Sequence, residues 1–272
     1  MEVTPFPSRP AILVSPAVLS SAMKQILVTN DDGVRSDGIH ALARALARLG
    51  DVFVVAPHLE ASAIGHALTL RRPLRVEQLD ARVYEVDGTP TDCVNIAIAK
   101  ILDGRPDVIV SGINKGYNLG DDVTYSGTVA GALEGALLGI PSVAVSLERS
   151  LDVYNFEHAA AAAAQVAEAV LIRGLPPRTF LNLNVPPGRP KGFRTTVQAH
   201  RNHVTVVDER VDPRGRAYYW IEEGQNNWTP HDRSDYQAVK EGYVSITPLQ
   251  PDLTDHAALS VIDELSVAAK VE

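Results

Sequence analysis

Residues 25–33 are Gln-Ile-Leu-Val-Thr-Asn-Asp-Asp-Gly, a short apolar run that stops at a turn-forming Asn-Asp-Asp-Gly segment. Apolar residues at near-helical spacing follow from Ile39 to Leu49, and Gly50 ends that run. A second apolar run, residues 51–56, is stopped by Pro57. The three segments predict a βαβ unit, in which two parallel strands are joined by a right-handed crossover.

The same alternation continues to residue 187. It predicts further strands at 82–86, 107–111, 142–146 and 180–185, and helices at 91–102, 128–138 and 156–172. Residues 112–127, rich in glycine and asparagine, are expected to form a long loop. The first strands lack polar alternation, which is typical of strands buried on both faces. We therefore expect a Rossmann-like α/β core, with a doubly wound and mostly parallel sheet, over residues 23–190.

After residue 190 the sequence no longer alternates between strand and helix patterns. Strand-like pieces around Pro213-Arg214-Gly215 predict a β-hairpin arm within residues 191–272, followed by a short helix, a last strand and a tail. Such an arm has too little core to stand alone, so it is expected to pack against a partner subunit. Trp220 and Trp228 are assigned to this packing, with nucleobase stacking as the alternative.

Residues 1–22 faintly resemble a signal peptide, but Glu2 offsets Arg9 and Pro16 interrupts the apolar run. We expect either a disordered arm or a start codon placed too early, with the real start at Met23.

Composition narrows the functional class. The chain has 272 residues and a formal charge of −8, from 25 basic and 33 acidic residues, which disfavours binding to a nucleic-acid duplex. No apolar stretch approaches the roughly 20 residues needed to cross a bilayer, so no membrane partner is expected. The single cysteine, Cys93, is assigned to the core. One cysteine permits no intrachain disulfide, which fits a reducing compartment, and we expect a cytoplasmic protein.

Oxygen-bearing side chains follow several strands at the edge where such sheets bind ligands. Asp31 and Asp32 follow the first strand, Ser62 follows the second, and Asn114 follows the strand at 107–111. Adjacent carboxylates at a strand end are costly unless a cation neutralises them. Oxygen-only donors suit Mg²⁺ or Mn²⁺ better than zinc. The alternative interpretation of Asp-Asp-Gly is a plain turn with a helix cap.

Ser126-Gly127-Thr128 opens the helix predicted from residue 128. Free backbone N–H groups, two hydroxyls and the positive dipole end together form an anion site, with simple capping as the alternative. The glycines of the preceding loop match neither G-x-G-x-x-G nor a P-loop, so classical dinucleotide binding is disfavoured. His66 is the one histidine that shares a loop with Ser62, and Asn182 and Asn184 add polar groups to the strand at 180–185.

Six stretches closely resemble the SurE family of nucleotidases, which hydrolyse nucleoside monophosphates: residues 26–33, 88–94, 111–122, 125–129, 181–186 and 242–249. The resemblance implies one divalent cation per subunit, Mg²⁺ or Mn²⁺, held by Asp31, Asp32, Ser62 and Asn114. It implies a phosphate pocket lined by Asn118, Ser126, Gly127 and Thr128. It also implies a homodimer or homotetramer that exchanges the hairpin and tail. Ile64 departs from the small residue common at its position and alters the expected pocket wall.

The activity implied by this resemblance is 5'-nucleotidase, a phosphoric monoester hydrolase. Hydrolysis of 3'-nucleotides and short polyphosphate is also allowed. In the mechanism we infer, Asp32 is the general base or the nucleophile, while Asn118 and Ser126 stabilise the equatorial phosphate oxygens. The alternative is a non-catalytic nucleotide- or metal-binding regulatory module on the same scaffold, because a fold does not fix a function.

Overall fold

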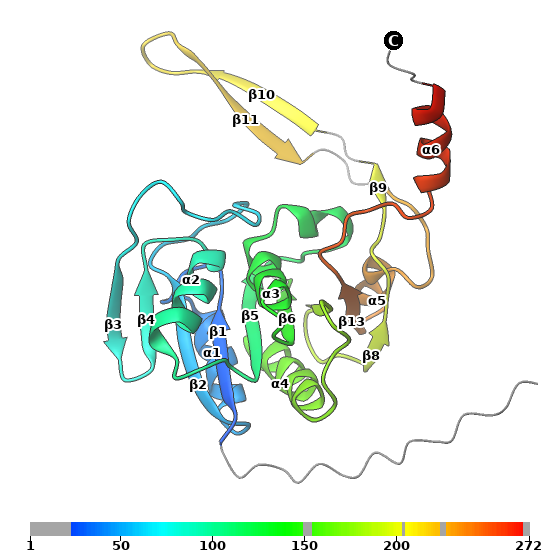
Figure 1. The fold of residues 1–272 in the computed structure, drawn as a ribbon. Coiled ribbons are helices and arrows are strands. Elements are labelled where there is room, and N and C mark those ends of the chain that lie inside the picture. Colours follow the sequence, from blue (N-terminus) through cyan, green and yellow to red (C-terminus); the bar gives the residue numbers. More distant parts are fainter. Residues whose placement is uncertain (1–22, 149–153, 203–204, 224–226, 269–272) are drawn as a thin grey trace, which may run out of the picture.

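The computed structural model describes residues 23–148, 154–202, 205–223 and 227–268. Their main feature is a nine-stranded sheet with the strand order β3-β4-β2-β1-β5-β6-β7-β13-β8 (Figure 1). Its parallel central strands are β1 (Gln25–Thr29), β2 (Asp51–Pro57), β4 (Val83–Val86), β5 (Val108–Lys115), β6 (Ser142–Leu147) and β7 (Phe180–Val185). At the two sides, β3 (Val76–Asp80) and β13 (Val244–Leu249) pair antiparallel with their inner neighbours, and β8 (Phe193–Thr195) pairs parallel with β13.

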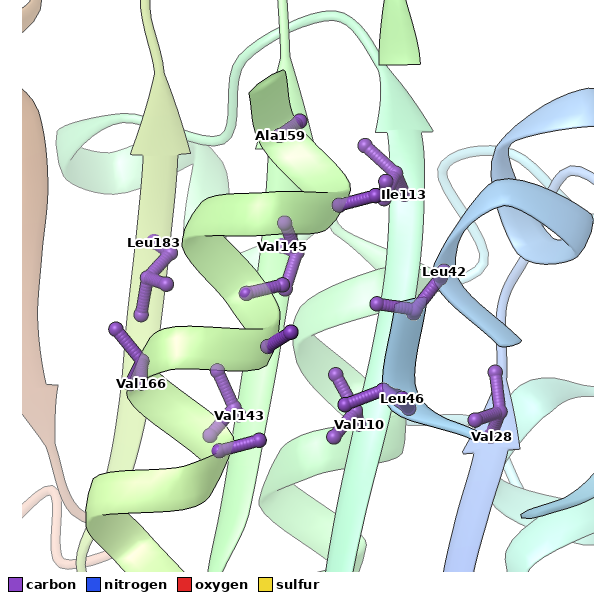
Figure 2. Packing of buried hydrophobic residues seen from close by; sticks show 14 of the residues in the cluster. Val28, Leu42, Leu46, Val110, Ile113, Val143, Val145, Ala159, Val166 and Leu183 are labelled. Atoms are coloured by element: carbon purple, nitrogen blue, oxygen red, sulfur yellow. The ribbon is translucent and has the colours of Figure 1, made fainter. Parts of the chain in front are cut away.

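Helices cover both faces of this sheet. On one face, α1 (Asp37–Leu46) and α4 (Phe156–Arg173) pack over the inward side chains of the central strands. Figure 2 shows Leu46 of α1 and Val166 of α4 among the side chains of β5, β6 and β7. On the other face lie α2 (Pro90–Ile96) and α3 (Gly127–Leu137). Ile26 belongs to the first face and Leu27 to the second, so β1 is apolar on both sides, and the doubly wound prediction is confirmed.

The winding of the chain reverses between β1 and β5. From β1 the sheet grows outward through β2 and β4 on one side and through β5, β6 and β7 on the other. In open α/β sheets, the crevice beyond the carboxyl ends of strands at such a switch point is where ligands bind. The topology therefore places the segments after Thr29 and around Lys115 at this crevice.

Two predicted segments differ from the structure. The prediction that a loop begins at residue 112 was wrong, because β5 continues to Lys115. A register shift against β6 between Ser111 and Asn114 marks a bulge that lets the strand run on through Gly112, where a Cβ atom would lie 2.4 Å from the Val145 carbonyl oxygen. The helix expected at 91–102 ends as α2 at Ile96 and continues as a π-helical turn, η1 (Ala97–Ile101).

The C-terminal third supplies the predicted hairpin, β10 (Thr205–Val211) paired antiparallel with β11 (Ala217–Glu223). Figure 1 shows this hairpin extending away from the sheet. A small antiparallel pair, β9 (Arg201–Asn202) with β12 (Asn227–Trp228), flanks the hairpin in the chain. The helix α5 (Asp235–Lys240) follows before β13, and α6 (Leu259–Ala268) ends the described residues. The short arm predicted at 1–22 lies outside the described residues. No helix in the described ranges is long and apolar enough to cross a membrane.

Candidate metal and phosphate site

The two adjacent aspartates lie in the turn that follows β1. Asp31 is 5% exposed and Asp32 is half-buried. The turn is held in shape by Asn30, whose Nδ2 donates to the Gly33 carbonyl oxygen at 3.0 Å and to Ser36 Oγ at 2.8 Å. A fixed turn presents both carboxylates at the crevice without the entropic cost of ordering them on binding.

The N-terminus of α3 lies directly against Asp31. Thr128 Oγ1 donates a hydrogen bond to Asp31 Oδ1. Gly127 packs so closely that a Cβ atom there would lie 2.8 Å from Asp31 Cβ and 2.9 Å from Asp31 Oδ2. Ser126 caps the helix by accepting from the Val129 N–H at 3.1 Å, which leaves the N–H groups of Gly127 and Thr128 outside the cap. The predicted cation ligand Asp31 is therefore in direct contact with two of the predicted phosphate residues, Gly127 and Thr128.

The other two predicted ligands come from neighbouring segments. The Ser62 loop (residues 58–75) is tied to the turn by the Ala61 N–H, which donates to the Asp31 carbonyl oxygen at 2.8 Å. The end of β5 is tied to it by the Lys115 N–H, which donates to Asp32 Oδ2 at 3.3 Å. Within the described residues, no hydrogen bond joins the Ser62 or Asn114 side chain to either aspartate. Ser62 Oγ donates to Glu60 Oε1 at 2.7 Å, and Asn114 Nδ2 donates to the Gly116 carbonyl oxygen at 3.0 Å, which leaves Asn114 Oδ1 as an oxygen donor for a ligand.

Burial makes the ionised form of both aspartates less favourable. Burial raises the pKa of Asp31 to about 6, the charge of Asp32 adds to this rise, and the hydrogen bond from Thr128 opposes it. Burial also raises the pKa of Asp32, which the charge of Lys115 opposes and the charge of Glu60 reinforces. A cation at this place would offset the cost of keeping both carboxylates ionised.

The donor set fits a hard divalent cation. Two carboxylates are available, and Ser62 and Asn114 would add a hydroxyl and an amide oxygen from segments that are hydrogen-bonded to the aspartate turn. Across the described ranges, no group of three or more His, Cys, Asp or Glu side chains is arranged to hold a metal. Magnesium is commonly held by one or two carboxylates, with water and substrate phosphate completing its shell, so a site poor in charged ligands suits it.

Asn118 lies on the segment between β5 and the 3₁₀ helix η2 (Gly120–Thr124), which we name the Asn118 loop (residues 116–119). The side chain is 7% exposed, and its Nδ2 donates to Ser146 Oγ at 2.7 Å. No hydrogen bond among the described residues joins it to Ser126 or to the aspartates. Asn118 therefore shares the carboxyl edge of the sheet with the other predicted residues but is held by separate partners.

Sequence reasoning missed Glu60 and Lys115 as neighbours of Asp32. Glu60 lies two residues before Ser62 and Lys115 lies directly after Asn114. A charged side chain so close to a predicted ligand in the chain was the signal in the sequence that could have identified them, because both charges act on Asp32.

His66 is joined to Glu134 on α3 by a 2.7 Å contact, and Asn95 Nδ2 donates to the same carboxylate at 2.8 Å. The His66 contact fastens the Ser62 loop to α3, and the Asn95 contact joins α2 to α3.

The 88–94 motif has a structural role in this chain. Thr89 and Asp92 form a capping box at the start of α2, and Asp92 Oδ1 also accepts from the Thr69 N–H at 2.9 Å. Thr89 Oγ1 donates to the Ala67 carbonyl oxygen at 2.7 Å. The motif thus anchors the C-terminal part of the Ser62 loop to the start of α2. Among the described contacts, none of its side chains is hydrogen-bonded to Asp31 or Asp32.

Fold and site together define a Rossmann-like α/β protein in which a pair of adjacent aspartates lies against the N-terminus of a helix. The chain belongs to the SurE family, because the family model described as "Survival protein SurE" matches residues 26–205. A protein named 5'-nucleotidase SurE from Geotalea daltonii is 50% identical over 246 residues, spanning 89% of this chain and 99% of that protein. One of the same name from Pelobacter propionicus is 54% identical over 240 residues, spanning 87% and 97%. The crystal structure of SurE protein from Aquifex aeolicus matches with a TM-score of 0.80 and 44% identity, covering 89% of this chain and 99% of that one.

Proposed function

We propose that this chain is a divalent-metal-dependent 5'-nucleotidase that hydrolyses nucleoside 5'-monophosphates to a nucleoside and phosphate. The observation that carries the proposal is the contact of Gly127 and Thr128 with Asp31, because it makes the helix N-terminus and the carboxylate pair two sides of one site. The relatives named 5'-nucleotidase SurE support the same activity. In this proposal each subunit holds one cation, Mg²⁺ or Mn²⁺, through Asp31, Asp32, Ser62 and Asn114.

The cation supplies Lewis-acid polarisation of the phosphate and a water of lowered pKa when it is bound. The other roles belong to the chain. The backbone N–H groups of Gly127 and Thr128, at the positive end of α3, bind the phosphate oxygens. The Ser126 hydroxyl and the Asn118 amide donate hydrogen bonds to the equatorial phosphate oxygens. Asp32 Oδ1 takes a proton from the water that attacks phosphorus, the P–O5' bond breaks, and that proton passes to the departing nucleoside oxygen. In the alternative route Asp32 Oδ1 attacks phosphorus, the nucleoside leaves with a proton from water, and water then hydrolyses the acyl phosphate. In both routes Asp32 Oδ2 is held by the Lys115 N–H.

The experiment that tests this proposal is phosphate release from a panel of nucleoside 5'-monophosphates, 3'-monophosphates and short polyphosphate, each with Mg²⁺ or Mn²⁺ added. We expect release from at least one 5'-monophosphate and a ranking of the bases. Absence of release from every compound, by protein shown to be folded and to bind the metal, would contradict a nucleotidase and favour a non-catalytic regulatory module.

The assembly is part of the proposal. The hairpin exposes Val207, Tyr219, Trp220 and Ile221, and α6 exposes Leu259, Val261, Ile262 and Leu265. Apolar surface of this extent on projecting elements is typical of a subunit interface. We infer that a second copy covers them, in a homodimer or homotetramer built from the core at 23–190 and the exchanged segment at 191–272. A monomeric mass by light scattering would contradict this.

A further inference from the structure

β7 carries two asparagines in an otherwise apolar strand. Asn182 and Asn184 are both 0% exposed, and both point to the same side of the strand because they are two residues apart. A buried amide costs free energy unless its polar atoms find partners, so two of them in one strand require an explanation. The mechanism proposed above gives neither of them a role.

Their partner is the backbone of Asn118. The Asn118 N–H donates to Asn184 Oδ1 at 2.8 Å. The Asn118 carbonyl oxygen accepts two hydrogen bonds, from Asn182 Nδ2 at 2.8 Å and from Asn184 Nδ2 at 3.0 Å. Both backbone groups of this one residue are therefore satisfied by side chains of a strand more than sixty positions away in the chain.

The side chain of Asn118 is held as well. Its Nδ2 donates to Ser146 Oγ on β6, which is fully buried. A primary amide has two N–H groups, so this bond fixes the orientation of the amide and leaves the second N–H for a ligand. One residue is thus fixed at its N–H, its carbonyl oxygen and its side chain.

The far end of the Asn118 loop is fastened by α5. Asp235 Oδ2 accepts from the Gly120 N–H at 2.9 Å, and Asp235 Oδ1 accepts from the Ala199 N–H at the same distance. Asn114 Nδ2 binds the carbonyl oxygen of Gly116 at the near end. The loop has few ways to move, and Asn118 lies at its centre.

We propose that Asn182, Asn184 and Ser146 are positioning residues that hold Asn118 in the orientation needed to donate its free amide N–H to the phosphate. This inference rests on the proposed function, because it takes the phosphate as the ligand of Asn118. A donor that is fixed before the reaction stabilises developing charge without reorganising, whereas misplacement by about 1 Å costs on the order of 10²-fold in rate. The three residues act through Asn118 and touch no substrate.

The test compares Asn184→Ala and Ser146→Ala with wild type in the full-length, metal-loaded protein. The readouts are kcat and KM for adenosine 5'-monophosphate and the Kd for Mn²⁺. We expect kcat to fall by roughly 10- to 100-fold in Asn184→Ala and by a smaller factor in Ser146→Ala. The Kd for Mn²⁺ should stay within about twofold of wild type. Neither side chain is hydrogen-bonded to any of the four proposed ligands in the described residues, and Ser146, which pairs with Asn114 in the β5–β6 register, loses only its hydroxyl in this variant.

Ser245→Ala is the matched control. Ser245 is fully buried on β13 and stands opposite Asn184 in the strand register, but its Oγ has no hydrogen-bond partner. We expect this variant to keep wild-type kcat and metal affinity. Folded Asn184→Ala and Ser146→Ala proteins with wild-type kcat would overturn the proposal. So would a loss of kcat matched by an equal loss of Mn²⁺ affinity, which indicates general distortion. If Asn184→Ala fails to fold, Ser146→Ala decides, since it removes one oxygen only.

A wild-type protein without turnover would instead refute the proposed function. The positioning contacts are then tested by amide hydrogen exchange of the full chain. Slow exchange at the Asn118 amide that becomes fast in Asn184→Ala, and stays slow in Ser245→Ala, supports them. Equal exchange in all three proteins would overturn them.

Discussion

Asp32→Asn is expected to lower phosphate release by at least about 10³-fold while the protein stays folded. The amide has the shape of the carboxylate and keeps an acceptor for the Lys115 N–H. It loses the negative charge that holds the cation and the basic oxygen that takes a proton. Removing one of two adjacent carboxylates also relieves their repulsion, so the melting temperature of the metal-free protein should not fall.

The matched control is Asp37→Asn. Asp37 is an exposed carboxylate in the first turn of α1, on the same segment of chain but outside the site. It should retain wild-type turnover. The comparison needs kcat, Kd for Mn²⁺ and thermal unfolding of all three proteins. A fully active Asp32→Asn enzyme would remove Asp32 from both of its proposed roles.

Gly127→Ala is expected to cost about 10²-fold in kcat/KM, the second-largest effect. The added methyl group would lie 2.8 Å from Asp31 Cβ, closer than such atoms approach, so the start of α3 and the aspartate must separate. The backbone N–H groups that bind phosphate then move relative to the cation. Alanine is a good helix former, so the local helix propensity improves and the loss is one of geometry.

Gly131→Ala is the comparison for this prediction. One turn further along α3, its methyl group would meet Ser111 Oγ at 2.8 Å and leave Asp31 untouched. This variant should lose stability with a smaller effect on kcat/KM. Equal activity losses in the two variants, in proportion to their losses of stability, would show that Gly127 matters for packing alone.

The sequence was sufficient to predict the parts of the site that depend on local pattern and topology. Asp31 and Asp32 end an apolar strand, and the βαβ order places that strand end at the ligand-binding edge of the sheet. The Ser-Gly-Thr start of α3 was likewise visible as an anion-binding helix N-terminus. The contact between them was not visible, because it depends on how closely α3 approaches β1 across almost a hundred residues of chain.

Other features had no local signal. β3 is exposed along its whole length, so it shows no alternation of apolar residues that would predict a strand. The bulge that carries β5 past Gly112 depends on its pairing with β6. Asn182 and Asn184 were recognised as polar residues in a strand, but their purpose requires the position of Asn118, which only the folded sheet supplies.

The central claim is that a divalent cation at Asp31 and Asp32 makes this site hydrolytic. The most direct measurement is phosphate release from the preferred nucleoside 5'-monophosphate before EDTA treatment, after it, and after Mg²⁺ or Mn²⁺ is restored, with Asp32→Asn carried through the same steps. In wild type, phosphate release is expected to stop with EDTA and to return with the cation, and in Asp32→Asn it should not return. Release that persists in EDTA, from protein shown to be free of metal, would contradict the central claim.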